Sequence, residues 1–339
     1  MGNVTFFSPY IYQPRGNSTT ARRIIGGLEK DGLDVKSFAY CEEELPEDKI
    51  SELKNTKIYH ILHFRRFAEW QLATNFQLDK PYILTSGGTD VNQDLFQERE
   101  KEVMRNLVEN ASMITVFNED AKDKLLSVYN LLAKQVEIVS QSIWFPENIQ
   151  TNRNRLQNGY PKLLLPAGLR EVKDVLYLIP AIEELQQSIF PEIQFTIIGA
   201  PLDEYIEEQV REAYTRYHWL DYIEDVPFEE MPAIYEQSDI VLNTSLSEGQ
   251  PIALLEAMYC HKPVMARKIA GNESLIKDNV NGFIFDNLGE FKRKLEMLVI
   301  REDLRETFIK NGLNTLTNKH ALEKEIASYK RIYAKCLHP

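Results

Sequence analysis

Short apolar segments alternate with helical segments along nearly the whole chain. Strands that alternate with helices predict parallel sheets covered by helices on both faces. We expect helices at 19–30, at about 174–187 and, at the end of the chain, at about 321–336. The fold class is therefore predicted to be α/β. The segments that we expect to form strands are Val4–Phe7, Val35–Phe38, Ile58–Leu62, Tyr82–Thr85, Met113–Val116, Val136–Val139, Lys162–Leu165, Phe195–Gly199, Ile240–Leu242 and Val264–Ala266.

The chain is long enough for two domains. Its 339 residues provide material for two hydrophobic cores. A polar stretch at 146–161, rich in Asn, Gln and Arg, separates two similar patterns and has the composition of a linker. We therefore predict one domain over 1–148, a second over 149–318, and a separate terminal helix within 319–339.

Composition excludes several classes of protein. The chain has 39 Lys and Arg against 51 Asp and Glu, a net charge of −12 to which both halves contribute, so we expect no nucleic-acid partner. It has no apolar run long enough for a transmembrane segment, and its first residues lead directly into a strand pattern without the features of a secretory signal. Three scattered cysteines suggest neither a disulfide framework nor a metal cluster. We expect a reduced, cytoplasmic protein.

Two glutamates eight positions apart, Glu248 and Glu256, give the clearest functional signal. Glu256 lies in an apolar helical stretch, where a carboxylate is costly to bury unless it meets a partner or a ligand hydroxyl. Pro251 suits the first turn of a helix, so residues 249–252 should present free backbone N–H groups towards an anion. This arrangement predicts a pocket for a polyhydroxylated, phosphorylated ligand.

The motif resembles the glutamate signature of the glycosyl transferases group 1, which are retaining glycosyltransferases of family 4. The resemblance runs from about residue 16 to about residue 290. It implies the GT-B fold, with two Rossmann-like domains facing across a cleft. The first domain would take the acceptor, the second would take the nucleotide-sugar donor, and the terminal helix would cross back to the first domain. The segments that carry the resemblance are Gly16–Thr20, Gly87–Asp90, Gly168–Asp174, Glu248–Met258, Lys262–Val264, Ile269–Asn272 and Asn281–Phe285.

The resemblance implies a role for several residues of the second domain. Arg170 and Lys173 would contact the donor diphosphate and stabilise its charge as it leaves; two surface cations near a helix start are the alternative. Glu248 would meet hydroxyls of the donor sugar, or be an exposed turn residue. Glu256 would accept hydrogen bonds from the ribose hydroxyls, or be a buried glutamate paired with Lys or Arg. The backbone residues that would touch sugar or phosphate are Gly249, Gln250, Pro251 and Ile252.

The first domain offers a second set of candidates. Gly16 and Asn17 would let backbone N–H groups approach the donor diphosphate, although Asn17 or Ser18 could simply cap a helix. His63, Gly88, Thr89 and Asp90 lie near strand ends and would face the acceptor or the sugar. For Asp90 the alternative is an Asx-type turn, and for His63 a satisfied core histidine. Arg65 and Arg66 indicate a solvated pair rather than a site for an acidic acceptor or anionic lipid.

The resemblance implies a retaining glycosyltransferase, which we expect to be metal-independent. It would move a hexosyl or N-acetylhexosaminyl group from a nucleotide-diphosphate sugar, of the UDP or GDP type, to an unknown acceptor: a glycan, protein, lipid or small molecule. We expect no cofactor and no metal, because the sequence has no Asp-x-Asp motif. A non-catalytic nucleotide-sugar-binding protein or partner subunit, or a nucleotide-sugar epimerase of the same fold, is the alternative.

Overall fold

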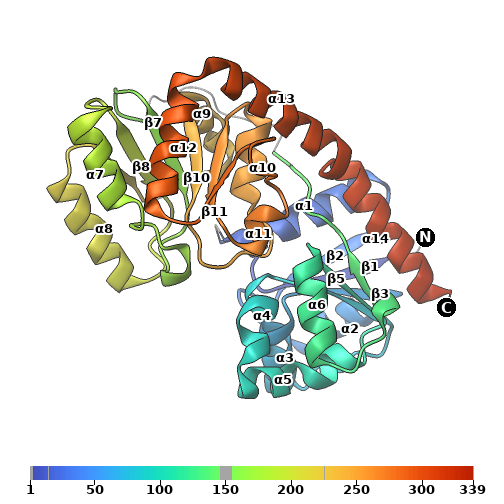
Figure 1. Cartoon of the computed structure of the whole chain (residues 1–339). Helices are drawn as coiled ribbons and strands as arrows, with labels where there is room; N and C mark the ends of the chain where they lie inside the picture. The colour runs from blue at the N-terminus through green and yellow to red at the C-terminus, as the bar shows by residue number, and fades with distance from the viewer. Residues whose placement is uncertain (1–2, 14, 146–154, 225, 339) are drawn as a thin grey trace. The chain divides into compact units, whose positions relative to one another are not determined.

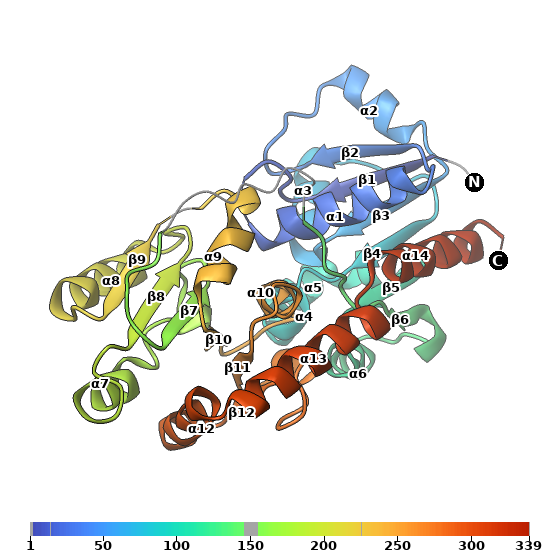
Figure 2. The same cartoon turned by 90° about the horizontal axis from the view of Figure 1, so that it is seen from above.

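The computed structural model describes residues 3–13, 15–145, 155–224 and 226–338. The chain forms two compact units. Unit 1 comprises Met1–Ser142 together with Ala321–Pro339, and unit 2 comprises Ile143–His320. Each unit is described by itself (Figures 1 and 2).

Unit 1 is a parallel sheet with helices on both faces. The strand order is β2-β1-β3-β4-β5-β6. β2 therefore pairs with one edge of β1, and β3 pairs with the other, so the strand order reverses at β1. Ligands of such sheets bind at the carboxyl ends of the strands where this reversal occurs, which here is the end of β1 and β3. The elements are β1 (Val4–Ser8), α1 (Gly16–Lys30), β2 (Val35–Ala39), α2 (Glu47–Lys54), β3 (Ile58–Leu62), α3 (Phe64–Thr74), β4 (Tyr82–Thr85), α4 (Thr89–Asn92), η1 (Asp94–Phe96), α5 (Glu98–Glu109), β5 (Met113–Val116), α6 (Glu119–Val128), η2 (Ala133–Gln135), β6 (Val136–Ile138) and α14 (Leu322–Leu337).

The apolar runs of unit 1 form strands because both faces of the sheet are buried. β1, β3, β4 and β5 have no exposed residue, as expected for central strands of a parallel sheet. On one face, residues of α1 and α14 pack on the sheet. On the other face, α2, α3, α5 and α6 supply the core.

Helix α14 is fastened to unit 1 by a buried ion pair. Nε of Arg23, on α1, donates to Oε2 of Glu325, on α14, at 2.9 Å, and both side chains are 1% exposed. The same carboxylate accepts from the backbone N–H and the hydroxyl of Ser142, at 3.0 and 2.5 Å. Nδ1 of His60, on β3, lies 2.6 Å from the hydroxyl of Tyr333, on α14. The last helix is therefore part of unit 1, although 178 residues of unit 2 separate it from the rest.

Unit 2 repeats the architecture with the strand order β12-β11-β10-β7-β8-β9. Its order reverses between β7 and β10, which pair in parallel. The elements are β7 (Lys162–Pro166), η3 (Glu171–Lys173), α7 (Ile179–Ser188), β8 (Gln194–Ile198), α8 (Glu204–Arg216), β9 (Leu220–Ile223), η4 (Phe228–Glu230), α9 (Met231–Gln237), β10 (Ile240–Asn243), α10 (Ile252–Tyr259), β11 (Val264–Arg267), α11 (Ala270–Glu273), β12 (Phe283–Phe285), α12 (Leu288–Ile300) and α13 (Glu302–Lys319).

Two cores lie on the two faces of the second sheet. Residues of α7, α8 and α12 cover one face, and residues of α9 and α10 cover the other. Helix α13 contributes Phe308 to the first core and Leu316 to the second. The loops at the carboxyl ends of β7 and β10 are thereby held on a rigid base.

The α/β class and the strand series are confirmed, and the differences have physical causes. Every predicted strand is present within one residue at each end, but β9 and β12 were not predicted as strands. The helix expected from about 174 begins instead at Ile179, because Asp174 is left-handed (φ 44°) and a proline occupies the first turn of α7. The helix expected from 19 begins at Gly16.

The predicted domain boundaries, 148/149 and 318/319, stay predictions. The first lies in 146–154, outside the described residues, whereas the compact units divide after Ser142 and after His320. Among the described helices, none combines the length and the apolar character that crossing a bilayer requires.

Candidate active site

The centre of the site in unit 2 is an ion pair between Lys173 and Glu248. Nζ of Lys173 lies 2.5 Å from Oε1 of Glu248, and the side chains are 17% and 13% exposed. Lys173 ends η3 in the loop after β7, and Glu248 lies in the loop after β10. Because β7 and β10 are the strands between which the order reverses, the pair lies where a doubly wound sheet binds its ligand.

Two short polar side chains fix Glu248. Oε1 accepts from Oγ of Ser245 at 2.7 Å and from Nδ2 of Asn243 at 3.4 Å. Burial raises the pKa of the Glu248 carboxyl, but the charge of Lys173 and the hydrogen bonds from Lys173, Ser245 and Asn243 outweigh burial and hold that pKa below its usual range. Glu248 is therefore an anion with a fixed orientation.

Residues of the segment after β11 support the loop that carries Glu248. Nδ2 of Asn272 donates to Oδ1 of Asn243 at 3.1 Å and to the carbonyl of Arg267 at 2.8 Å. Gly271 lies so close that a Cβ there would sit 2.4 Å from the carbonyl oxygen of Glu248. Only glycine leaves room for the Glu248 backbone at this position.

A hydrogen bond and an ion pair stabilise the loop that carries Arg170 and Lys173. The carbonyl of Lys173 accepts from the hydroxyl of Thr244 at 2.9 Å. Asp174, which follows in the left-handed region, accepts from Nη1 of Arg267 at 2.6 Å. The guanidinium of Arg267 also lies 4.1 Å from the ring centroid of Tyr177. Arg170 begins the η3 turn, in which Lys173 N–H donates to its carbonyl at 2.9 Å.

Glu256 lies on α10, which begins at Ile252. Pro251 is the N-cap residue just before the helix, and is not part of its first turn as predicted. Its side chain is buried, and its Oε2 accepts from the hydroxyl of Tyr235, on α9, at 2.6 Å. Burial, followed by the charge of Glu256, holds the pKa of the Tyr235 hydroxyl well above its ordinary value. The buried Glu256 thus has a tyrosine among its partners, and its pairing with Lys or Arg stays a prediction.

Gly249 and Gln250 complete the loop between Glu248 and α10. Gln250 is buried, and its Nε2 donates to Oγ of Ser274 at 3.3 Å. Ser274 in turn donates to the carbonyl of Gly271 at 2.7 Å. The loop is therefore tied to the same segment after β11 that supports Glu248.

The remaining predicted residues belong to unit 1. Gly16 and Asn17 are the first two residues of α1, and Arg15 is the N-cap residue. Neither Asn17 nor Ser18 caps the helix, so that alternative is wrong: the helix begins earlier than the pattern suggested. Gly16 has open space around it, since a Cβ there would meet no atom within 4 Å.

Asp90 organises the loop after β4. It is fully buried, and its carboxylate accepts from the N–H of Phe64 at 2.9 Å, from the hydroxyl of Ser86 at 2.8 Å and from the N–H of Gly87 at 2.9 Å. These bonds join the start of α3 to the turn after β4 and differ from the predicted Asx-type turn, in which the carboxylate would accept from a backbone N–H two residues further on. A direct role towards a substrate stays a prediction.

His63 is held in a strained conformation beside Asp90. Its φ is 73°, its Nε2 lies 3.1 Å from the hydroxyl of Thr89, and its Nδ1 lies 3.8 Å from Oδ2 of Asp90. Burial lowers the pKa of His63 to about 4, against the opposing effect of Asp90. A Cβ on Gly87 would lie 2.6 Å from Cδ2 of the His63 ring, and Gly88 has a φ of 98°. Backbone strain of this kind is concentrated at functional sites.

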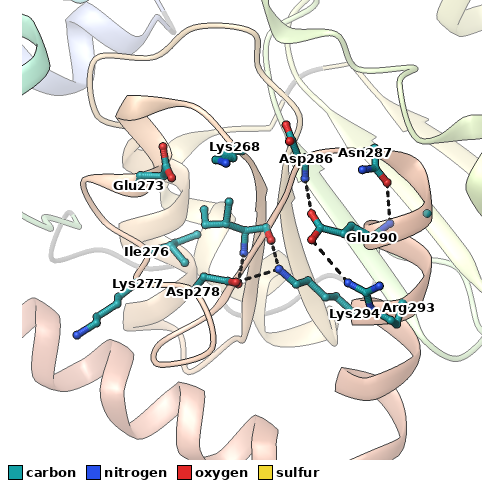
Figure 3. Close-up of a pocket in the computed structure, with 12 residues that line it drawn as sticks. Lys268, Glu273, Ile276, Lys277, Asp278, Asp286, Asn287, Glu290, Arg293 and Lys294 are labelled. Atoms are coloured by element: carbon teal, nitrogen blue, oxygen red, sulfur yellow. Dashed lines mark hydrogen bonds and ion pairs between the residues drawn. The ribbon is translucent and has the colours of Figure 1, made fainter.

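A pocket of about 930 Å³ lies elsewhere in unit 2, around the ends of β11 and β12 (Figure 3). Its charged groups largely neutralise one another: Lys294 contacts Asp278 at 2.9 Å, and Arg293 contacts Glu290 at 3.6 Å. It contains none of the predicted site residues. Among the described residues, no three His, Cys, Asp or Glu side chains gather as metal ligands would.

The two doubly wound sheets and the site at the reversal of the second define a GT-B protein. The structure superposes on the Anabaena protein HepE in complex with UDP and glucose, with a TM-score of 0.78, 14% identity and coverage of 98% of this chain and 100% of HepE. It also superposes on sucrose-phosphate synthase from Thermosynechococcus elongatus, with a TM-score of 0.76, 15% identity and 98% of each chain covered. The GT-B fold predicted from the sequence is confirmed.

Two sequence comparisons show similarity to glycosyltransferases. Residues 147–315 match the model of the family described as glycosyl transferases group 1. The chain is also 28% identical, over 329 residues, to a Xenopus tropicalis protein named glycosyltransferase 1 domain-containing protein 1, covering 94% of this chain and 93% of that protein. These findings support glycosyltransferase activity.

Sequence reasoning missed several residues that shape this site. Asn243 and Ser245 were not among the predicted site residues, and Asn272 and Gly271 were only part of a motif. Their signal was present, because each follows a predicted strand whose carboxyl end faces the site. Tyr235 gave no signal, since nothing in the sequence pairs it with Glu256.

Proposed function

We propose that the chain is a metal-independent, retaining glycosyltransferase that uses a nucleotide-diphosphate sugar. The observation that carries this proposal is the Lys173–Glu248 ion pair at the strand-order reversal of unit 2. It places a fixed cation, suited to a phosphate oxygen, next to a fixed carboxylate, suited to sugar hydroxyls. HepE, which shares the fold, has UDP and glucose in its structure, which supports a nucleotide sugar as the ligand.

Each residue has a defined part in the proposed reaction. Lys173 and Arg170 bind the diphosphate and stabilise the negative charge that develops as it departs. Glu248 accepts hydrogen bonds from the donor sugar, and Glu256, oriented by Tyr235, accepts them from the ribose. The backbone of Gly249, Gln250, Pro251 and Ile252 lines the sugar and phosphate.

The proposed chemistry is a front-face substitution. The bond between the anomeric carbon and the diphosphate oxygen breaks, and the acceptor oxygen bonds to the same face of that carbon. The proton of the acceptor hydroxyl passes to the departing phosphate oxygen. The protein contributes position and electrostatics rather than a covalent nucleophile.

Thermal stabilisation by UDP-, GDP-, ADP- and dTDP-sugars, with and without EDTA, tests the donor site. A ligand at 100 times its Kd adds about 2.7 kcal/mol of stability, which a melting curve resolves. We expect one nucleotide class to shift the Tm equally with and without EDTA. A shift that EDTA abolishes would contradict metal independence, and no shift with any donor would contradict the function.

Variants then separate the two carboxylates. We expect Glu256→Gln to weaken nucleotide binding, and Glu248→Ala to lower transfer more than nucleotide affinity. Arg211→Gln, which alters an exposed arginine paired with Glu207 and Glu224, is the matched control and should change neither. Equal nucleotide affinity in wild type and Glu256→Gln would remove that assignment. Anomeric configuration of the product, determined by NMR, tests retention.

A further inference from the structure

Two arginines share one tyrosine ring at the carboxyl edge of unit 1. The guanidinium carbon of Arg15 lies 4.3 Å from the ring centroid of Tyr10, and that of Arg66 lies 5.2 Å from it. Nη1 of Arg66 also donates to the Tyr10 hydroxyl at 2.7 Å. Tyr10 therefore holds both cations in place without neutralising either.

Arg66 differs sharply from its neighbour Arg65. Arg65 is paired with Asp94 at 2.8 Å and with Glu69 at 2.9 Å. Within the described residues Arg66 makes no ion pair, and its buried Nε has no hydrogen-bond partner. A partly buried guanidinium without a counter-ion among the described residues favours the approach of an anion to its accessible N–H groups.

The location is the strand-order reversal of unit 1. Tyr10 follows β1, Arg66 lies in the first turn of α3 after β3, and these two strands pair in parallel. Burial lowers the pKa of His63, and the charges of Arg66 and Arg65 lower it further against the effect of Asp90. Arg66 thus lies within electrostatic range of the strained His63, at the edge where ligands of such sheets bind.

The carboxylates around this edge are already occupied. Glu42 accepts from the backbone N–H groups of Ile11, Tyr12 and Gln13 at 2.7, 3.0 and 2.8 Å. Asp90 accepts from Phe64 and Gly87, as described above. Glu42 shapes the loop that carries Tyr10 and acts on Arg15 only at a distance. Neither carboxylate serves as a counter-ion for Arg66.

We propose that Arg66 and Arg15, positioned by Tyr10, bind a phosphate group carried by the acceptor. Guanidinium groups match phosphate oxygens in geometry and charge. A phosphate monoester carries a charge of about −1.5 to −2 at neutral pH and three acceptor oxygens, which suits two cations better than a single carboxylate would. This inference deepens the proposed function. It rests on the proposed function in one respect: the ligand is identified as the acceptor because Lys173 and Arg170 are already assigned to the donor phosphates.

Isothermal titration with glycerol 3-phosphate, and with glycerol as the uncharged comparison, tests the site in the full-length protein. We expect binding of glycerol 3-phosphate alone, weakened at least about 10-fold by Arg66→Gln. Arg65→Gln, one residue away, should change affinity less than about two-fold because its charge is already paired. Arg15→Gln provides a second variant if Arg66→Gln does not fold, and Arg66→Lys should retain part of the affinity.

Several outcomes would overturn the proposal. They are no preference for glycerol 3-phosphate over glycerol together with no Arg66-dependent binding to phosphatidic acid vesicles, equal losses in Arg65→Gln and Arg66→Gln, or a parallel loss of nucleotide affinity in Arg66→Gln, which would assign the arginines to the donor. Failure of every nucleotide sugar to bind, with Arg66-dependent phosphate binding intact, would remove the proposed function and leave the phosphate site. Phosphatidylcholine vesicles with and without phosphatidic acid distinguish a lipid phosphate from a soluble one. Arg66-dependent binding to the vesicles with phosphatidic acid, without binding to glycerol 3-phosphate, identifies the ligand as a lipid.

Discussion

The two units carry the same architecture but treat charge at their ligand-binding edges differently. In unit 2, the cation after β7 is already paired with a carboxylate after β10. In unit 1, the carboxylates after β2 and β4 are occupied by backbone and hydroxyl donors, and the cation Arg66 is left without an ion pair among the described residues. Both edges also contain a left-handed residue other than glycine, His63 in unit 1 and Asp174 in unit 2.

This difference shows why an ion pair must be judged by its surroundings. Lys173–Glu248 is partly exposed in the loops after β7 and β10, where a ligand can reach both charges. Arg23–Glu325, in unit 1, is buried between two helices, where nothing but the protein meets it. We therefore assign the first pair to the proposed donor site and the second to the stability of unit 1.

The largest expected effect comes from breaking the buried pair. Glu325→Leu should destabilise unit 1 by about 3–5 kcal/mol, because it leaves the Arg23 charge buried without its partner. Glu248→Gln should cost far less stability, because Lys173 is partly exposed and can reach water. Chemical denaturation followed by hydrogen exchange of each unit measures both. If the two variants lose equal stability, the distinction between the pairs is wrong.

Acid should destabilise unit 1 through His60. This histidine is fully buried between Tyr333 and Thr85, and burial lowers its pKa from 6.5 to about 3. Since the folded state disfavours the proton, the stability contribution is fully present above pH 6.5 and is lost as the pH falls towards 3. At pH 5 the loss is about 2 kcal/mol. Denaturation of wild type and His60→Gln between pH 7 and 5 measures it. A His60→Gln curve as steep as that of wild type would show that another group is responsible.

The sequence predicted the strands that support both sites better than the contacts between the side chains of each site. Strands were readable because full burial on both faces requires continuous apolar runs, as in β3 and β10. The short β12 was not predicted, because its residues were identified only as part of the Asn281–Phe285 motif. Lys173 and Glu248 were each selected by motif, but they lie 75 positions apart and only the fold brings them together.

The role of Asp90 shows a further limit. A carboxylate after two glycines at a strand end suggests a ligand contact, and only its surroundings reveal that backbone and hydroxyl donors occupy it. The prediction of Arg65 and Arg66 as a solvated pair treated them alike for the same reason. Which arginine finds a carboxylate depends on α3 facing Asp94, and this is a tertiary contact without a local signal.

One glycine in each unit tests how closely the site loops are packed. A Cβ at Gly271 would lie 2.4 Å from the Glu248 carbonyl oxygen, and one at Gly87 would lie 2.6 Å from the His63 ring. We expect Gly271→Ala and Gly87→Ala each to cost roughly 1–3 kcal/mol of stability. Gly271→Ala should also weaken nucleotide-sugar binding because it displaces Glu248, whereas Gly87→Ala should spare it.

Gly26→Ala is the control for both variants. A Cβ at Gly26, on α1, would meet nothing within 4 Å. Alanine favours a helix over glycine by roughly 0.5–1 kcal/mol, so this variant should be at least as stable as wild type. Equal effects of Gly271→Ala and Gly87→Ala on nucleotide-sugar affinity would contradict the assignment of Glu248 to the donor site.

The smallest expected effect isolates the hydrogen bond that orients Glu256. Tyr235→Phe removes a 2.6 Å bond to the buried carboxylate and should cost about 1 kcal/mol. Tyr222→Phe removes a comparable 3.1 Å bond to the Gly199 carbonyl in the same unit. If Glu256 binds the ribose, both variants lose similar stability, but only Tyr235→Phe also weakens nucleotide affinity, by about five-fold. Equal nucleotide affinity in the two variants would mean that Tyr235 serves the core of unit 2 alone, because a carboxylate that binds ribose is sensitive to the loss of its orienting partner.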